Sequence, residues 1–136
     1  MSAAPAVLFV CVKNGGKSQM AAALMALEAG DAVKVSSAGT SPGARVNGLA
    51  ADTLSELGID ISGETPTLLT ESAMRQAGRV VVLGREAQVP PIPGVTIDLW
   101  DTDEPSERGI GGRERMLLVR DDIHERVRQL LRQLLE

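Results

Sequence analysis

The stretch that decides the fold is Val7-Leu8-Phe9-Val10-Cys11-Val12-Lys13-Asn14-Gly15-Gly16-Lys17-Ser18-Gln19-Met20. The apolar run 7–10 has the length of a parallel strand that is buried on both faces, and it ends directly at Cys11. Asn14, Gly15 and Gly16 tolerate unusual backbone angles, so the chain can curl there and turn its N–H groups inward. Ser18 suits the N-cap of a following helix. The stretch therefore predicts a strand, an anion-binding turn and a helix, in that order.

Cys11 is the only cysteine of the chain, and it lies at the point where this strand meets this helix. Helix N-termini and nearby cations favour the thiolate form of a cysteine, which is the nucleophilic form. The position therefore predicts a reactive thiolate beside a bound oxyanion. Two plainer interpretations exist: Cys11 as a small buried hydrophobic residue, and the two glycines as an ordinary turn between a strand and a helix.

The rest of the chain alternates between strand and helix patterns. We predict strands at residues 6–10, 33–37, 79–83 and 95–99, and helices at 18–29, 46–57, 70–76 and 113–135. Strands separated by helices favour parallel pairing with helices on both faces of the sheet. The last helix is the clearest, because apolar residues from Met116 to Leu134 recur at helical spacing; its charged residues, and His124 with them, are expected at the surface. We predict one three-layer α/β domain over residues 1–136, with a central four-stranded parallel sheet.

Composition excludes several kinds of partner. A net charge of −4 and an aromatic content of 1% argue against nucleic acid. No apolar run approaches the length of a membrane span, and the first residues lack a charged signal-peptide start, so we expect a cytoplasmic protein without a membrane partner. No set of His, Cys and carboxylate residues has metal-site spacing, and we expect neither a metal nor a tightly bound cofactor.

A second candidate segment follows the predicted strand at 95–99 and reads Trp100-Asp101-Thr102-Asp103-Glu104-Pro105-Ser106. Ligands bind beyond the carboxyl ends of parallel strands, so this segment should lie at the same edge as Cys11. Asp103 and Glu104 are therefore candidates for a general acid. The alternative is an acidic, flexible surface loop.

The run Cys11-x-x-Asn14-x-x-Lys17-Ser18 resembles the Cys-x5-Arg-Ser phosphate loop of the low-molecular-weight protein tyrosine phosphatases and of the arsenate reductases that share their fold. Further segments resemble this superfamily at Ser37-Ala38-Gly39-Thr40, at Leu57-Gly58-Ile59-Asp60-Ile61-Ser62 and at Glu104-Pro105. The resemblance implies that Cys11, Lys17, Ser18 and Glu104, or failing it Asp103, are catalytic. It also implies that substrate binds to the phosphate loop, at Val12, Lys13, Asn14, Gly15, Gly16, Lys17 and Ser18.

Three departures from the superfamily pattern narrow the function. No aromatic residue follows Glu104-Pro105, and Trp100 is expected in the core. A phosphotyrosine ring would therefore have no aromatic side chain to pack against, which favours a bare oxyanion such as arsenate as substrate. Thioredoxin-coupled arsenate reductases of this fold use two further cysteines to resolve the adduct, and the segment 83–90, which resembles theirs, contains no cysteine. Lys17 replaces the usual arginine, and a lysine is a point charge where an arginine is a two-pronged fork.

Within the superfamily the chain resembles the single-cysteine, mycothiol-dependent arsenate reductases of actinobacteria. This resemblance implies that Cys11 attacks arsenate and that mycothiol, or failing it glutathione or another small thiol, removes the arsenic from the enzyme. A separate glutaredoxin-like protein would then reduce the product. Two other functions stay open at this point: a low-molecular-weight phosphatase and a non-catalytic oxyanion-binding module.

Overall fold

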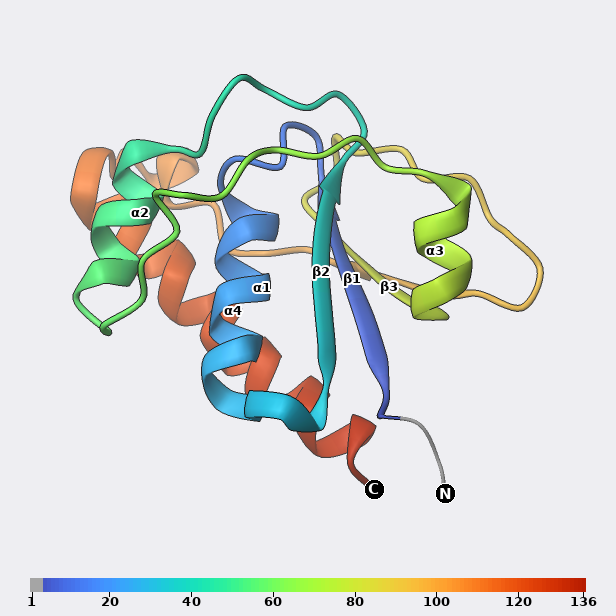
Figure 1. The fold of residues 1–136 in the computed structure, drawn as a ribbon. Helices are drawn as coiled ribbons and strands as arrows, with labels where there is room; N and C mark the ends of the chain where they lie inside the picture. The colour runs from blue at the N-terminus through green and yellow to red at the C-terminus, as the bar shows by residue number, and fades with distance from the viewer. Residues whose placement is uncertain (1–3) are drawn as a thin grey trace.

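The computed structural model describes residues 4–136, in which strands and helices alternate. Their order is β1 (Ala6–Cys11), α1 (Lys17–Ala29), the 3-10 helix η1 (Gly30–Ala32), β2 (Lys34–Gly39), α2 (Gly48–Ser55), α3 (Glu71–Ala77), β3 (Arg79–Leu83), β4 (Thr96–Trp100), the 3-10 helix η2 (Pro105–Arg108) and α4 (Gly112–Leu134). The strands form one parallel sheet in the order β2-β1-β3-β4 (Figure 1). The predicted four-stranded parallel sheet is confirmed.

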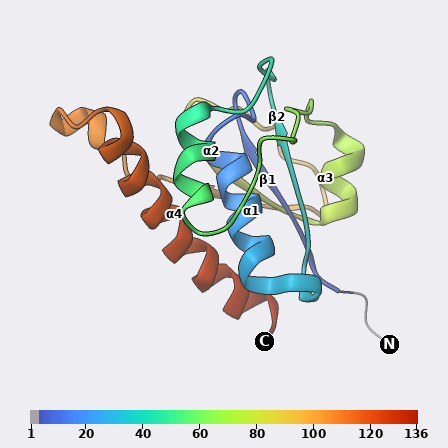
Figure 2. The ribbon, with the colours of Figure 1, turned by 60° about the vertical axis from the view of Figure 1, so that its left-hand side comes forward.

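The sheet lies between two layers of helices, and its central strands β1 and β3 are the most buried. Successive side chains of a strand point to opposite faces. Val7 and Phe9 of β1 accordingly join a large core cluster with α1, α2 and α4, whereas Leu8 and Val10 join a smaller cluster with Met74 of α3. Figures 1 and 2 show α1, α2 and α4 on one face of the sheet and α3 on the other. The predicted three-layer α/β architecture is confirmed.

The long helix α4 closes the larger core. Its apolar residues Met116, Val119, Ile123, Val127 and Leu130 are all buried against α1 and the sheet. Trp100, at the end of β4, packs on the same cluster, and its ring centroid lies 5.8 Å from that of Phe9. This tryptophan is therefore a core residue, as the sequence predicted.

Two local predictions are wrong. Ser18 is not the N-cap of α1: the helix begins at Lys17, its N-cap is Gly16, and no side chain caps it. The Ser18 hydroxyl turns toward Cys11 instead. His124 is not a surface residue, because only 13% of its side chain is exposed and its Nε2 lies 2.9 Å from Oε1 of Glu28 on α1. A polar contact between two packed helices has displaced it from the solvent.

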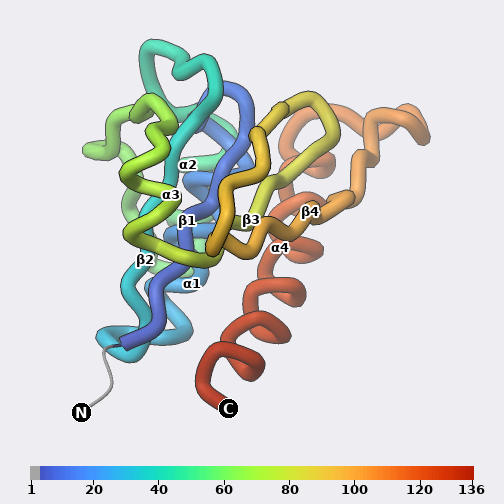
Figure 3. Tube along the Cα trace, turned by 90° about the vertical axis from the view of Figure 1, so that its right-hand side faces the viewer, coloured from blue at the N-terminus to red at the C-terminus, as the bar shows by residue number. Residues whose placement is uncertain are grey.

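The parallel order gathers the functional loops at one edge of the sheet. The loops that follow β1, β2 and β3 lie at the end away from both termini (Figure 3). Residues 101–111, which we call the acid loop, follow β4 and lead into α4. Among residues 4–136, no helix is both long enough and apolar enough to cross a membrane.

Candidate active site

The phosphate loop, residues 11–18, turns its carbonyl groups outward. The carbonyls of Cys11, Val12, Lys13 and Gly15 accept hydrogen bonds from N–H groups within residues 40–47, at distances from 2.6 to 3.1 Å. A trans peptide points its carbonyl and the N–H of the next residue in opposite directions, so the N–H groups of Val12, Lys13, Asn14 and Gly16 point inward. These N–H groups, together with the start of α1, form the hollow that an oxyanion needs.

Two residues fix the curl of this loop. Asn14 adopts a positive φ of 53°, a conformation that asparagine tolerates better than most residues. Gly39, at the end of β2, lies against the loop: a Cβ there would stand 2.6 Å from the Val12 carbonyl oxygen and 2.9 Å from the Asn14 Cβ. Only glycine therefore allows β2 and the loop to approach this closely.

A buried chain of hydrogen bonds ends at the Cys11 sulfur. Asn14 Nδ2 donates to Ser18 Oγ at 2.7 Å, and Ser18 Oγ lies 2.9 Å from Cys11 Sγ. When Cys11 is ionised, the hydroxyl is the donor of this pair, because a thiolate has no proton to give. Asn14 Oδ1 in turn accepts from Gln19 Nε2 at 3.3 Å and from the Thr67 N–H at 3.0 Å. The chain holds Ser18 in the orientation that stabilises a thiolate.

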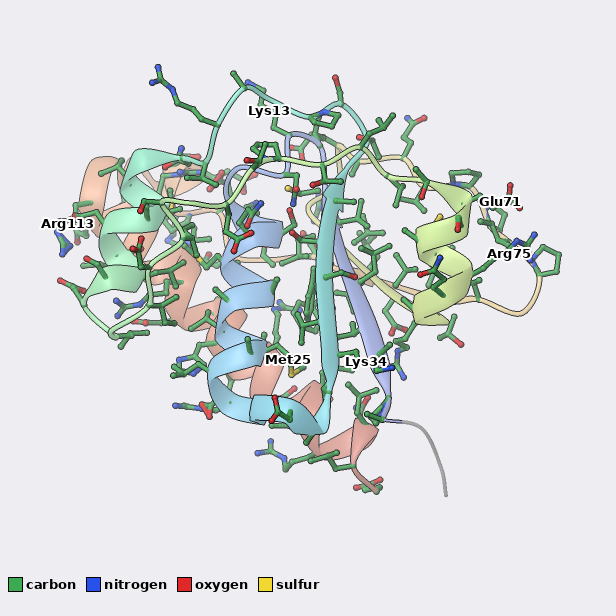
Figure 4. The ribbon with its side chains drawn as sticks, viewed as in Figure 1. Lys13, Met25, Lys34, Glu71, Arg75 and Arg113 are labelled. Carbon is green, nitrogen blue, oxygen red and sulfur yellow. The ribbon has the colours of Figure 1, made fainter. Side chains whose placement is uncertain are left out.

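The two lysines of the loop point in different directions. Lys13 lies at the top of the molecule in Figure 4 and lines a shallow hollow beside Arg45 and Asn47. Lys17 lines a separate cavity of about 250 Å³ between the phosphate loop and the acid loop. Lys17 is thus the residue of the phosphate loop that reaches toward the predicted general acids.

This cavity is lined almost entirely by charged side chains. Three cations and five carboxylates contribute to it, with Gly84 and Thr102 as the remaining members. The charged residues are Lys17, Arg85, Arg108, Glu86, Asp101, Asp103, Glu104 and Glu107. The lining contains no aromatic residue. The cavity therefore offers ion pairs and hydrogen bonds, and it carries an excess of negative charge.

Each candidate acid is held by an arginine. Arg115 binds both oxygens of Glu104, at 3.2 and 2.6 Å, and Arg108 binds both oxygens of Asp103, at 2.7 and 3.1 Å. Arg115 holds the pKa of Glu104 below its usual range, with the charge of Lys17 acting in the same direction. Arg108 lowers the pKa of Asp103 in the same way. In this state both carboxyl groups are ionised at neutral pH.

The structure places the predicted site residues in two groups. Cys11, Asn14 and Ser18 are in contact, while Lys17, Asp103 and Glu104 meet around the cavity. Val12, Lys13, Gly15 and Gly16 contribute backbone N–H groups to the loop. Cys11 itself does not line the cavity, so Lys17 is the link between the two groups.

The sequence analysis missed several contributors to the site. Among them are Gln19, Gly39, Thr67, Asp101 and Arg115. Gly39 lies in a segment that resembles the superfamily, and Arg115 opens the predicted last helix, so their positions carried a signal. Nothing in the sequence around Thr67 indicates that its N–H reaches a loop more than fifty residues away. Within residues 4–136, no three His, Cys, Asp or Glu side chains are grouped as a metal site requires.

Comparison with known proteins identifies the family of this chain. The family model described as low molecular weight phosphotyrosine protein phosphatase matches residues 6–90. Arsenate reductase 2 of Staphylococcus saprophyticus is 32% identical over 90% of this chain and 93% of its own length, and the arsenate reductase of Bacillus subtilis is 32% identical over 90% and 92%.

Among solved structures, the thioredoxin-dependent arsenate reductase Cg_ArsC1' of Corynebacterium glutamicum superposes with a TM-score of 0.83 at 33% identity. The match covers 98% of this chain but only 63% of that protein. Fold, phosphate loop and relatives therefore agree that this chain belongs to the low molecular weight phosphotyrosine protein phosphatase family, as a relative of its arsenate reductases.

Proposed function

We propose that this protein is an arsenate reductase that passes the arsenic to a small thiol. One observation carries the proposal: the only cysteine lies under a hydroxyl donor at the base of a loop of inward-facing N–H groups. The adjoining cavity has no aromatic lining to hold a phosphotyrosine ring. Relatives named arsenate reductases, which match along nearly the whole chain, support the choice of arsenate as the oxyanion.

The first step is a displacement at arsenic. The Cys11 thiolate attacks arsenate that is bound to the N–H groups of residues 12–18, and a sulfur–arsenic bond forms as one arsenic–oxygen bond breaks. Lys17 neutralises the oxyanion. Negative charge on bound arsenate raises the pKa of Glu104 and so favours its protonated form. The departing hydroxyl takes this proton from Glu104 and leaves as water. Arsenic stays in its higher oxidation state, so this step needs no reductant.

The second step removes the arsenic from Cys11. A thiol attacks the adduct, a new sulfur–arsenic bond forms, and the bond to Cys11 breaks, which returns the Cys11 thiolate. No other cysteine of this chain can make that attack, because Cys11 is the only one. We propose mycothiol as the thiol, and a glutaredoxin-like protein as the separate enzyme that supplies the electrons to the released product.

The charge of the cavity supports an uncharged thiol. Five carboxylates and three cations line the cavity between the phosphate loop and the acid loop, and an anionic thiol such as glutathione that entered it would be repelled by that excess. Mycothiol carries its thiol on a neutral sugar scaffold, whose hydroxyl groups can donate to carboxylate oxygens. The same carboxylates that disfavour glutathione are therefore hydrogen-bond acceptors for a hydroxylated thiol.

The thiol assignment is tested by arsenate turnover with mycothiol, glutathione and thioredoxin supplied separately. Mycothiol should give a soluble arseno-thiol product, detected by mass spectrometry; glutathione should be slower, and thioredoxin alone should give no turnover. Sustained arsenite production with thioredoxin as the only thiol donor would contradict the proposal. Steady hydrolysis of a chromogenic phosphate ester without any thiol would instead identify a phosphatase.

Replacing Lys17 by arginine should tighten the binding of oxyanions. An arginine fork reaches two oxygens of a tetrahedral anion, and one further hydrogen bond to a charged group contributes about 1.5–3 kcal/mol, or about 10- to 100-fold in affinity. We expect stronger inhibition by phosphate and a lower KM for arsenate, with little gain in kcat because uniform binding does not lower the barrier.

The matched control for this change is Lys34→Arg, since Lys34 lies at the start of β2, far from the loop in Figure 4. Phosphate inhibition is measured at a fixed concentration of thiol in both variants. Equal inhibition constants in Lys17→Arg and the parent protein would mean that lysine is merely tolerated at this position.

A further inference from the structure

Arg115 contacts the acid loop from behind the cavity. It lies in the first turn of α4, its Nε donates to Glu104 Oε2 at 3.2 Å, and its Nη2 donates to Oε1 at 2.6 Å. Glu104 lines the cavity, whereas Arg115 does not. Side-chain exposure is similar for the two residues, at 28% for Arg115 and 30% for Glu104, so the pair is shielded from most of the solvent. Arg115 therefore reaches the reacting groups only through Glu104.

We propose that Arg115 is a positioning residue, which aims Glu104 at the cavity and sets the pH at which Glu104 takes up the proton it delivers. This inference rests on the proposed role of Glu104 as general acid. A carboxyl bound through both oxygens has a fixed orientation, and each catalytic cycle leaves it ionised after the proton has gone to the departing oxygen. Arg115 stabilises that ionised form, so it opposes the uptake of the next proton by Glu104.

The other charges around Glu104 are arranged so that Arg115 dominates. Lys17 of α1 and Ser106 of η2 also lower the pKa of Glu104, each by less than Arg115 does. Arg85 and Glu86, which follow β3, line the same cavity. The acid loop itself adds four more charged residues: Asp101, Asp103, Glu107 and Arg108. Within this set Asp101 is paired with Arg85, and Asp103 is paired with Arg108.

The sign of the pH effect follows from these contacts. Arg115 is the largest influence on Glu104, and it holds the pKa of that carboxyl below its usual range. Bound arsenate and the Cys11 thiolate act in the opposite direction, because negative charge nearby disfavours an ionised carboxyl. A general acid works only while protonated, so the rate falls as pH rises through its pKa. Removing the charge of Arg115 raises that pKa and moves the falling limb to higher pH.

The experiment compares pH profiles of kcat/KM for arsenate at saturating mycothiol. Arg115→Gln should move the falling limb upward by about one pH unit or more. Arg115→Lys keeps the charge without the fork, so it should leave the limb close to its original position while lowering the plateau. The titration of arsenate itself is common to all variants and cancels in the comparison.

The matched control is Arg113→Gln. Arg113 lies in the same turn of α4, but it pairs with Glu56 and Asp52 and not with a carboxylate of the acid loop. This variant should keep the parent profile. If the falling limb of the kcat/KM profile lies at the same pH in Arg115→Gln and in Arg113→Gln, the inference is overturned and Arg115 is a structural residue. This holds whatever the plateau value of kcat/KM is in either variant.

Glu104→Gln separates this inference from the function on which it rests. A profile unchanged in Glu104→Gln removes Glu104 as the general acid, and the proposed role fails together with the inference. Loss of the falling limb in Glu104→Gln, combined with an unmoved limb in Arg115→Gln, overturns only the inference. Loss of the limb in the first variant and an upward shift in the second support both.

Discussion

Replacing Cys11 by serine should abolish arsenate-dependent consumption of mycothiol, down to the rate of the uncatalysed reaction. The proposed bond to arsenic forms on the sulfur, and a serine hydroxyl is not ionised at neutral pH and is a far weaker nucleophile. The loss should be complete, because the chain contains no second cysteine to take over. Thiol consumption is followed with arsenate present and absent, so that spontaneous thiol oxidation can be subtracted.

Anion binding provides the control for this variant. The N–H groups of residues 12–18 and the Asn14–Ser18 hydrogen bond do not depend on the sulfur, so phosphate should still bind to Cys11→Ser. Binding is measured by calorimetric titration with inorganic phosphate. Loss of turnover with retained binding supports the nucleophile. Turnover equal to that of the parent protein would exclude Cys11 as the nucleophile, whereas a parent protein that binds phosphate without any turnover would be an oxyanion-binding module.

The fold could be predicted from the sequence because its strongest signals are local. Buried parallel strands read as short apolar runs, and the four observed strands lie within two residues of the predicted bounds at either end. The amphipathic pattern of α4 is equally plain, since its buried residues recur at helical spacing over the whole helix. Neither signal depends on knowing which distant segments come into contact.

The site was only partly predictable, because its geometry depends on contacts between distant segments. Asn14 and Gly15 indicate an unusual turn in the sequence. The sequence does not show that residues 40–47 donate hydrogen bonds to the carbonyls of the phosphate loop and thereby turn the N–H groups of that loop inward. Ser18 has the residue type of an N-cap, and the sequence predicts that role for it. In the structure the Ser18 hydroxyl contacts Cys11 instead. Asn14 donates a hydrogen bond to the Ser18 oxygen, so the Ser18 proton is free to be donated to the Cys11 sulfur.

The pairing of the acid loop with arginines was also invisible in the sequence. Asp103 and Arg108 are five residues apart and meet because η2 folds the loop back on itself. Glu104 and Arg115 meet only because α4 begins beside the cavity. The sequence therefore identifies which carboxylates are near the site, while their protonation follows from partners that the fold supplies.

The structure favours Glu104 over its neighbours as the general acid. The charge of Lys17 lowers the pKa of Glu104 and of Asp101, and it is not among the influences on the pKa of Asp103. Asp101 is paired with the exposed Arg85, and 59% of its own side chain is exposed, so water competes for its proton. Glu104 alone combines partial burial, contact with the cavity and the influence of Lys17.

Replacing Glu104 by glutamine should therefore slow formation of the Cys11–arsenic adduct by about 10²- to 10⁴-fold, the usual contribution of a general acid. Glutamine keeps the size of the side chain and one acceptor for Arg115, so the loop should stay in place while the transferable proton is lost. The matched variant Asp103→Asn removes a carboxylate of the same loop that also pairs with an arginine, and it should lose only a few-fold. Rapid-mixing measurement of adduct formation isolates this step from the later attack by mycothiol. The opposite ranking would move the acid to Asp103, and a large loss confined to Asp101→Asn would move it to the end of β4, where Lys17 supplies the same electrostatic influence without the fork of Arg115.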